Sequence, residues 1–589
     1  VVDVIDRDQI DQSGASNLAE FLDTVAGVNL SRLYGRSGVD ASLDIGYMGE
    51  SGAQNVLVLV DGQRLNAMDQ SSVLFSQIPL GSVRRIEIRK ANGGSLYGDR
   101  AQGGVVNIIT REDDARQSSL SLGSFGARKL DAYVGMQAEG VKASLGWMSA
   151  RSDGYRQHSA SQQESVQIKL STADDWGRLG VSALLFAEKA QLPSYLTTSQ
   201  FLENTRAVGA FPLISDRTGG SAGLRYDRVF GEGSAFSLDL SHRSSEDTSY
   251  STIHHRRTVV TPEMRSKAGA WEWMLGAEWS LADADTRSGK QVARRSDSIY
   301  GQVNRPLGQQ LSLEASARVE QVGNEFQVSP LLAGSTSSAR QSAVSLAGRY
   351  AIAQNTMLRL AALSGFRFPN ADELYYFDRS SYELLTINPT VKPMQSQEWT
   401  FQMVHAVDSG QLDLHYRRIG SKDEIGYRYD CGTVDGSAAS CNTNLYDSRR
   451  EVLSLGARWQ LTSSFSVRGT LDLVQARINS GLDLGQRIPL TPRQAARFSG
   501  SYVVHGYTLM AAASYRSEMV QASDPSATYP KIPGRTVVDL GVSKMLSDRW
   551  MMSAWLRNAF DKRYYDFAQF DGLYPADGRG LFLTLKASL

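Results

Sequence analysis

The chain has 589 residues, which is too long for one ordinary hydrophobic core, so it forms either several domains or one very large closed architecture. Lysine plus arginine and aspartate plus glutamate are equal at 62 each, so no basic excess points to nucleic acid as a partner. With 53 glycines, 15 prolines and a mean hydropathy of −0.29, the composition matches neither a disordered chain nor a helical membrane protein. No run reaches the roughly 18 consecutive apolar residues of a spanning helix, so a membrane-embedded form would have to cross as a closed barrel.

The first expected element in chain order is a helix within residues 17–28. Asn17 is placed to cap it, Glu20 stands at the third helical position, and Gly27 supplies a stop. Its apolar residues share one face of the helix, namely Leu18, Phe21, Leu22 and Val25.

Residues 78–111 contain two strand-like runs around a glycine-dense turn. In the first run, Ile86 and Ile88 alternate with charged residues at a period of two, and residues 105–109 form a second, more apolar run. The glycines between the two runs, from Gly93 to Gly104, permit positive φ and close backbone approach. The segment therefore predicts a pair of strands in a small α/β unit.

Together with LVLVDGQRLN at 57–66, this segment closely resembles the plug domain of TonB-dependent outer-membrane receptors. That family carries a "vLvlvDGvrln" run followed by "ieRIEvv…lYG..A.GGvINIiT". The chain has the matching elements in the same order: Asp61-Gly62, Arg85-Ile86-Glu87, Leu96-Tyr97-Gly98 and Gly103 to Thr110. Two places depart from the pattern, Ala91-Asn92-Gly93 in place of Gly-Pro and Leu43 to Gly46 in place of a segment with an arginine.

Residues 116–589 read as a long series of alternating segments about ten residues long, separated by polar or glycine-containing turns, which is typical of a transmembrane β-barrel. Residues 271–281 are the clearest case, with three tryptophans on one face. About twenty strands can be picked out, and the resemblance implies 22. The expected fold is therefore an N-terminal α/β plug, residues 1–115, inside a barrel of about 22 antiparallel strands, residues 116–589.

The end of the chain resembles the same family. Residues 581–589 alternate leucines and alanine with polar or aromatic residues, as a last barrel strand requires, although the terminal residue is Leu589 and not an aromatic. Residues 558–565 resemble the "NlFDk.Y" segment before the last hairpin. Long loops are expected where alternation lapses, at 189–220, 246–268, 366–395, 420–447 and 518–535.

The sequence contains no recognisable arrangement of catalytic residues. The seven histidines form no Ser-His-Asp pattern and no His-Glu-x-x-His helix, and the glycine run at 93–104 lacks the ending of a phosphate loop. We therefore expect neither an enzyme nor a cofactor. Cys431 and Cys441, ten residues apart in a stretch rich in small residues, are expected to form a loop-closing disulfide in an oxidising compartment, with two free buried thiols as the alternative.

The turns before and after the DG strand are the expected ligand site, because in the family they point outward. The candidate residues are Tyr47, Met48 and Glu50 in the first turn and Asp69 and Gln70 in the second. A soft-metal site at Met48 and Met68 is a weaker alternative.

Two further segments contain candidate ligand-binding residues. Tyr375, Tyr376 and Arg379 lie on an expected extracellular loop and could stack on or pair with a ligand, or else belong to an aromatic girdle. His254 and His255 are expected in a loop, as part of a metal or anion site or as a solvated loop.

The plug arginines Arg84, Arg85 and Arg89 are expected to pair with inward barrel carboxylates, because buried charges demand partners. On this hypothesis, replacing Arg85 with alanine slows uptake.

The resemblance implies active uptake of a scarce ligand, most often a ferric siderophore, across the outer membrane of a Gram-negative bacterium. The alternatives are a receptor for cobalamin or another small organic cofactor and, in a different class, a passive porin or surface adhesin. The implied partners are the TonB-ExbB-ExbD complex, a metal chelate or vitamin ligand, and outer-membrane lipid. The receptor is expected to be a monomer.

Overall fold

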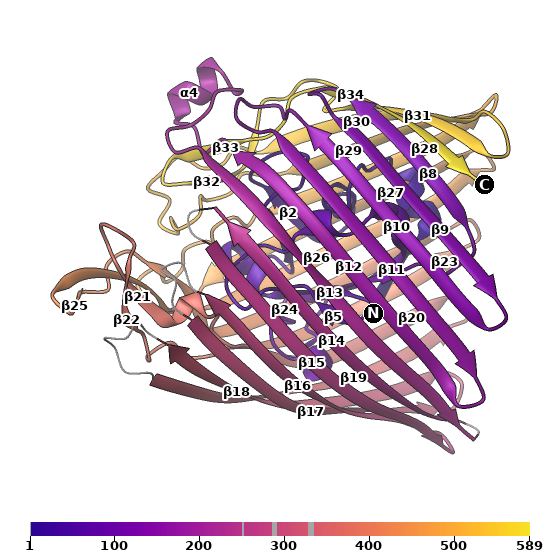
Figure 1. Ribbon diagram of the computed structural model, residues 1–589, viewed down its shortest axis with the longest axis horizontal. Helices are drawn as coiled ribbons and strands as arrows, with labels where there is room; N and C mark the ends of the chain where they lie inside the picture. Colours follow the sequence, from indigo (N-terminus) through magenta and orange to yellow (C-terminus); the bar gives the residue numbers. More distant parts are fainter. Residues whose placement is uncertain (1, 232, 250–251, 286–290, 328–334) are drawn as a thin grey trace.

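A computed structural model of the protein describes residues 2–231, 233–249, 252–285, 291–327 and 335–589. In these residues a closed barrel of 22 antiparallel strands surrounds an N-terminal domain, as expected from the sequence. Figure 1 shows this domain, in indigo, inside the barrel. Among the described residues, no helix is both long and apolar enough to span a membrane.

The N-terminal domain, the plug, is built on a five-stranded sheet in the order β1-β6-β7-β4-β5. β4 and β7 are parallel, whereas β6 pairs antiparallel with both β1 and β7. Its core consists of aliphatic side chains such as Ile10, Leu22, Val58 and Ile86. The elements are β1 (Val2–Asp6), α1 (Arg7–Gln12), α2 (Leu18–Leu22), β2 (Val28–Arg32), β3 (Ala41–Ile45), η1 (Gly49–Gln54), β4 (Val56–Val60), β5 (Gln63–Arg64), η2 (Phe75–Gln77), η3 (Leu80–Ser82), β6 (Val83–Arg89), α3 (Gly94–Tyr97) and β7 (Gly104–Thr110).

The predicted pair of strands is β6 and β7, with α3 and the glycine turn between them. The predicted helix is α2. Asn17 caps it by accepting a hydrogen bond from the backbone N–H of Glu20 at 2.8 Å, as expected. The helix is shorter than the pattern indicates, because it ends at Leu22 with Asp23 as its C-cap.

The barrel begins at β8, five residues after the plug sheet ends, and closes where β34 pairs with β8. Its strands are β8 (Arg116–Gly123), β9 (Arg128–Ala138), β10 (Val141–Ser152), β11 (Ser161–Asp174), β12 (Gly177–Leu192), β13 (Leu213–Phe230), β14 (Ser234–Thr248), β15 (Thr252–Ala268), β16 (Trp271–Asp285), β17 (Gln291–Leu307), β18 (Leu311–Gln327), β19 (Ser335–Ala353), β20 (Thr356–Arg367), β23 (Met394–Val407), β24 (Gly410–Arg428), β26 (Ser437–Thr462), β27 (Phe465–Ile478), β28 (Gln494–Val504), β29 (Tyr507–Arg516), β30 (Arg535–Met545), β31 (Trp550–Arg557) and β34 (Gly580–Ser588).

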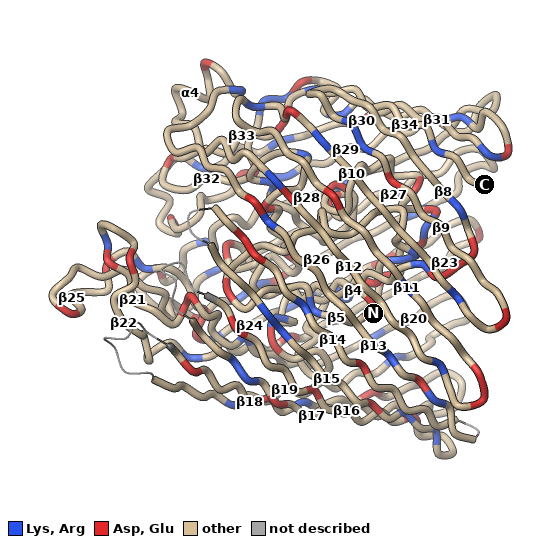
Figure 2. Tube along the Cα trace, viewed as in Figure 1, with Lys and Arg blue, Asp and Glu red and all other residues tan. Residues whose placement is uncertain are grey.

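Strand β16 shows how the two faces of the barrel wall differ. Trp279 and Leu281 are 47% and 62% exposed on the outer surface, as a lipid-facing surface requires. Glu278, the residue before Trp279, points into the lumen and pairs with Arg318 of β18 at 3.4 Å. Charges of both signs are interspersed along the trace, in agreement with the balanced composition (Figure 2).

The two ends of the barrel differ in the length of their connections. Short turns lie at the end that holds the C-terminus, and long loops lie at the other end (Figure 1). The loops contain α4 (Thr198–Glu203), η4 (Asp372–Leu374), β21 (Tyr375–Asp378), β22 (Leu384–Ile387), β25 (Thr433–Val434), β32 (Tyr565–Gln569) and β33 (Gly572–Pro575).

The predicted loops are only partly right. Connections are present at 193–212, 368–393 and 517–534, within or close to the expected ranges. The loop expected at 246–268 is wrong, because β14 runs to Thr248 and β15 begins at Thr252; residues 250–251 lie outside the described part. Much of the expected loop at 420–447 is also strand, since β24 and β26 extend into a projecting arm.

Candidate ligand-binding site

The first plug turn is held by the barrel wall. Gly46 and Tyr47 have φ of 86° and 59°, and this left-handed backbone turns the chain so that the Tyr47 hydroxyl donates to Asp472 of β27 at 2.7 Å. The guanidinium of Arg450 donates to the carbonyl oxygens of Tyr47 and Met48, at 2.9 and 3.2 Å. Tyr47 and Met48 are therefore buried against the wall in this structure.

Two other candidate residues of the plug turns bind loop residues. Glu50 accepts hydrogen bonds from the backbone N–H and the hydroxyl of Ser523, at 2.9 and 2.7 Å. The backbone N–H of Gln70 donates to Asp372 of η4 at 3.4 Å. The plug is thus in contact with the long loops of the barrel at both turns.

The carboxyl of Asp372 is enclosed among other acids. Burial raises its pKa to about 8, with a further contribution from the neighbouring carboxylates of Asp69 and Glu373. This contact between loop and plug is therefore sensitive to pH near neutrality.

The second plug turn borders a cavity of about 300 Å³ against the inner faces of β13 to β16. Gln70 and Met68 line it from the plug, and His255 lines it from β15. The ring nitrogen Nε2 of His255 lies 3.4 Å from Oδ2 of Asp69, which is ion-pair distance without hydrogen-bond geometry. The structure therefore brings together two candidates from the plug, Asp69 and Gln70, and one from the barrel.

His254 and His255 lie in a strand, so their expected position in a loop is wrong. They belong to β15, where successive side chains point to opposite sides. His255 faces the cavity, whereas His254 is exposed and lies 3.3 Å from Glu246.

The three loop candidates lie outside the cavity lining. Tyr375 is fully buried and packs edge-on against Phe326, with ring centroids 5.6 Å apart. Tyr376 pairs with Cys441 in the β21–β26 register, and Arg379 binds Asp430 at 2.5 Å.

Sequence reasoning missed the barrel residues that line the cavity. Arg217, Arg243 and Arg257 come from β13, β14 and β15, and Asp40 comes from the plug. Arg243 and Arg257 lie on the inward-facing side of their strands, together with Asp247 and His255. For Arg257 this period-two signal conflicts with the loop expected at 246–268, whereas Arg243 lies outside that range.

The expected pairing of plug arginines with barrel carboxylates is wrong for Arg85. It pairs at 2.7 Å with Glu87 of the same strand, because alternate side chains of a strand are neighbours on one face. Arg84 is exposed, and Nε of Arg89 is buried without a hydrogen-bond partner among the described residues.

Most ion pairs between the barrel and the plug have the reverse of the expected arrangement: the cation belongs to the barrel wall and the carboxylate to the plug. One exception is the longer contact of Arg64 with Glu278, at 3.9 Å. The pairs with barrel lysines and arginines are Arg557–Glu20 at 3.2 Å, Arg217–Asp40 at 2.7 Å, Lys169–Asp61 at 3.0 Å, Lys586–Asp11 at 2.5 Å and, longer, Arg497–Asp23 at 4.0 Å.

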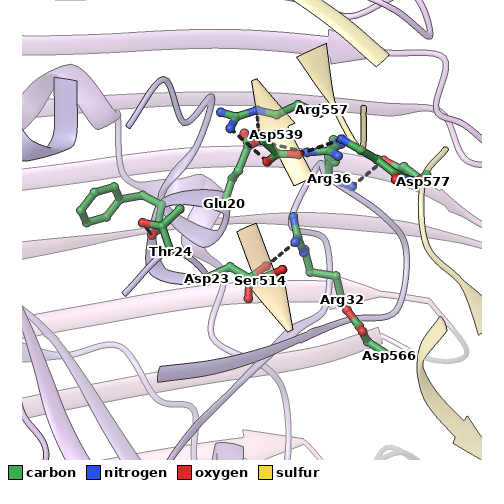
Figure 3. A network of polar contacts seen from close by, with 12 residues as sticks. Glu20, Asp23, Thr24, Arg32, Arg36, Ser514, Asp539, Arg557, Asp566 and Asp577 are labelled. Atoms are coloured by element: carbon green, nitrogen blue, oxygen red, sulfur yellow. Dashed lines mark hydrogen bonds and ion pairs between the residues drawn. The ribbon is translucent and has the colours of Figure 1, made fainter. Parts of the chain in front are cut away.

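Glu20 lies at the centre of the network drawn in Figure 3. Its carboxylate lies 3.2 Å from both Arg557 of the barrel and Arg36 of the plug. Burial raises the pKa of Glu20, but the two guanidiniums outweigh it and lower the pKa to about 2. Arg557 also pairs with Asp539, and the backbone N–H of Arg36 donates to Asp577. The network therefore holds α2 against β31 and its neighbours.

The predicted disulfide is confirmed. Cys431 and Cys441 are bonded, with their Cα atoms 6.1 Å apart, and the bond closes the tip of the arm formed by β24, β25 and β26. No group of His, Cys, Asp and Glu suited to hold a metal ion is found in the described ranges.

Comparison with known families agrees with this architecture. Residues 1–105 match the TonB-dependent receptor plug domain, and residues 94–559 match the TonB-dependent receptor-like β-barrel. The chain belongs to the TonB-dependent receptor family. This family consists of receptors and transporters of the outer membrane and not of enzymes.

Curated relatives of this receptor include vitamin B12 transporters. The vitamin B12 transporter BtuB of Photobacterium profundum is 23% identical over 590 residues, covering 96% of this chain and 89% of that protein. BtuB of Vibrio cholerae serotype O1 is 39% identical, but only over 138 residues, or 23% of this chain and 22% of that protein.

Solved structures show the same fold at low identity. The ferric citrate transporter FecA has a TM-score of 0.82 at 16% identity, with 100% of this chain and 97% of that chain covered. The copper transporter OprC has a TM-score of 0.82 at 16% identity and coverage of 100% and 99%. The siderophore receptor PiuA from Acinetobacter baumannii has a TM-score of 0.82 at 13% identity and coverage of 100% and 96%. Identities this low support the fold alone.

Proposed function

We propose that this TonB-dependent receptor carries out active uptake of a scarce small ligand across the outer membrane of a Gram-negative bacterium. The observation that carries the proposal is the cavity of about 300 Å³ between the second plug turn and the wall, on a plug that occupies the barrel lumen. A ligand in this cavity would contact both the plug, which has to move for transport, and the barrel wall, which does not. Family membership argues against a passive porin or an adhesin.

A ferric siderophore or similar metal chelate is the first candidate for the ligand. The cavity lining contains arginine, histidine and carboxylate side chains, which suit a polar, charged complex better than an apolar one. Similar folds include proteins named for ferric citrate and siderophores.

A cobalamin-type ligand is the second candidate. It is favoured by the match of 96% of the chain to a protein named as a vitamin B12 transporter. The charged lining of the cavity gives this candidate no particular support.

Energy for transport would come from the TonB-ExbB-ExbD complex acting on the plug, since a ligand must displace or remodel the plug to pass. The receptor is proposed to act as a monomer surrounded by outer-membrane lipid, because its lumen, plug and cavity all belong to one chain.

Uptake of radiolabelled ligands tests the proposal. Cells with and without the receptor would be offered ferric chelates and cobalamin, each with and without a protonophore that removes the energy source. We expect one class of ligand to accumulate only in energised cells that contain the receptor. Accumulation of all ligands without energy, or swelling of liposomes containing the purified protein in small sugars, would contradict a plugged receptor.

A further inference from the structure

In the cavity beside the second plug turn, the carboxylates have cationic or histidine neighbours, whereas two of the arginines form no ion pair among the described residues. Every carboxylate that lines it has a cationic or histidine neighbour. Asp40 and Asp247 both lie 2.7 Å from Arg217, which also contacts Glu188. The outer rim follows the same rule, since Asp283 pairs with Arg256 at 2.9 Å and Glu246 lies 3.3 Å from His254.

Two of the lining cations have no such partner. Arg243 forms no ion pair in the part of the chain that the structure describes, and its Nη1 is buried without a hydrogen-bond partner. Its guanidinium lies 5.5 Å from the ring centroid of Phe186, a contact that leaves the charge uncompensated.

Arg257 is in a similar position. Its one hydrogen bond among the described residues goes to the backbone carbonyl of Asn66, at 3.2 Å. Arg64, Arg100 and Arg294 act on it as like charges, and the carboxylates of Asp99 and Glu278 act on it as opposite charges. Among the described residues, however, Arg257 forms no ion pair with a carboxylate. A buried cation that has cationic neighbours and no ion pair of its own is stabilised by an anion that enters the cavity.

Arg243 and Arg257 lie side by side at the inner limit of the cavity. Both also line a second, narrow space of about 20 Å³ that leads toward Gln63 and Arg64 of β5. That space holds about one water molecule, so a ligand in the larger cavity would stop at the two guanidiniums.

We propose that this cavity binds a small organic anion through its carboxylate groups, with Arg243 and Arg257 as the residues that neutralise it. The inference rests on the proposed function and narrows it to a class of substrate. Planar guanidinium groups bind carboxylates through paired hydrogen bonds, and the two arginines offer their donors in a site shielded from bulk water. The volume of about 300 Å³ lies at the small end of ligand pockets, so a compact polycarboxylate or the carboxylate part of a chelate fits.

The same geometry links occupancy of the cavity to the plug. Asn66, whose carbonyl binds Arg257, is tied by its side chain to β4. Its Oδ1 accepts from the N–H of Val58 at 2.9 Å, and its Nδ2 donates to the carbonyl of Val56 at 3.0 Å. An anion that draws the guanidinium of Arg257 toward itself competes with the Asn66 contact and so loosens the second plug turn.

Equilibrium binding to the purified full-length receptor in detergent tests the proposal. The probes are citrate as a compact tricarboxylate, its neutral triethyl ester, and inorganic phosphate, each followed by calorimetry. We expect citrate to bind and the ester not to bind. Arg243→Gln and Arg257→Gln should each weaken citrate binding about tenfold or more, since each removes one charged partner. Arg243→Lys keeps the charge without the planar fork and should fall between the wild type and Arg243→Gln.

Arg468→Gln serves as the matched control, because Arg468 is a β27 arginine outside the cavity lining. It should bind citrate like the wild type. Resistance of the barrel to unfolding in detergent verifies that each variant is folded.

The proposal is overturned if citrate fails to bind the wild type, if the ester binds as tightly as citrate, if phosphate alone binds, or if the double variant Arg243→Gln/Arg257→Gln binds citrate unchanged. None of these outcomes touches energised uptake by cells, so the broader function can survive the loss of this inference.

Discussion

The carboxylate of Glu20 joins the plug to the barrel wall, and replacing it measures how firmly the plug is held. Its pKa lies at about 2 in the folded protein against 4.5 for the free side chain. A difference of this size corresponds to about 3 kcal/mol of preference for the charged form. Because the folded pKa is lowered, this contribution is complete above about pH 4.5 and is lost as the pH falls through about 2.

The variant Glu20→Gln removes the charge and keeps the size of the side chain. Arg557 retains Asp539 as a partner, whereas the guanidinium of Arg36 loses its ion pair, although the backbone N–H of Arg36 still donates to Asp577. We expect the plug to unfold at lower urea than in the wild type, with a midpoint lowered by about 1–3 M if the urea dependence is about 1–3 kcal/mol per M.

Plug unfolding can be followed with a fluorophore at position 8 of α1, introduced as Asp8→Cys, because no free cysteine occurs in the described chain. Glu87→Gln is the matched control. It breaks the Arg85 pair, which is partly exposed and lies within the plug, so it should cost less than about 1 kcal/mol. A midpoint shift for Glu20→Gln no larger than that for Glu87→Gln, or a wild-type midpoint unchanged between pH 5 and pH 2, would refute the reasoning.

Three other changes give distinct outcomes. Arg85→Ala should leave energised uptake within about twofold of the wild type, because its pair lies within the plug; a severe loss with normal receptor abundance would restore the original hypothesis of a barrel partner. Replacing Cys431 and Cys441 with serine removes a cross-link over a ten-residue separation, worth about 2–3 kcal/mol of chain entropy, so trypsin should cut the arm faster while the heat resistance of the barrel stays the same. Burial beside Asp69 and Glu373 raises the pKa of Asp372, although the hydrogen bond from Gln70 by itself favours the ionised carboxylate. Burial of this carboxyl against the plug is therefore favoured below about pH 8 and becomes unfavourable as the pH rises through about 8; a spin label at position 70 should become more mobile between pH 7 and pH 9, and Asp372→Asn should abolish that change.

Strand patterning made the fold predictable, since β16 alternates as a barrel wall requires and β6 and β7 follow the period-two signal of the plug. The same reasoning failed at 246–268. There the strand ends extend beyond the apolar belt, and the polar residues His254 to Arg257 no longer alternate with apolar ones even though the backbone remains in the sheet. Alternation of apolar and polar residues marks only the part of a strand whose outer face is apolar. It does not show how far the strand continues beyond that part with polar residues on both faces.

The site was less predictable because it depends on contacts between distant parts of the chain. Glu20 has the sequence features of a helix N-terminus, and nothing in them indicates its partner Arg557 in the penultimate barrel strand. The pairing of Arg85 with Glu87, by contrast, could have been read from the strand pattern, because residues two apart share a face. Arg243 and Arg257 stand out among the cavity residues because neither forms an ion pair in the described structure, which no local pattern encodes.

Several barrel arginines hold the plug by its main-chain oxygens. Arg450 binds the carbonyls of Tyr47 and Met48, Arg257 binds that of Asn66, and Arg417 binds that of Gly103. A carbonyl is present whatever residue carries it, so these attachments do not depend on the side chains of the plug turns. Side chains of the plug turns can therefore change in evolution, and with them the ligand that is bound, while the barrel arginines keep their hydrogen bonds to the same backbone carbonyls.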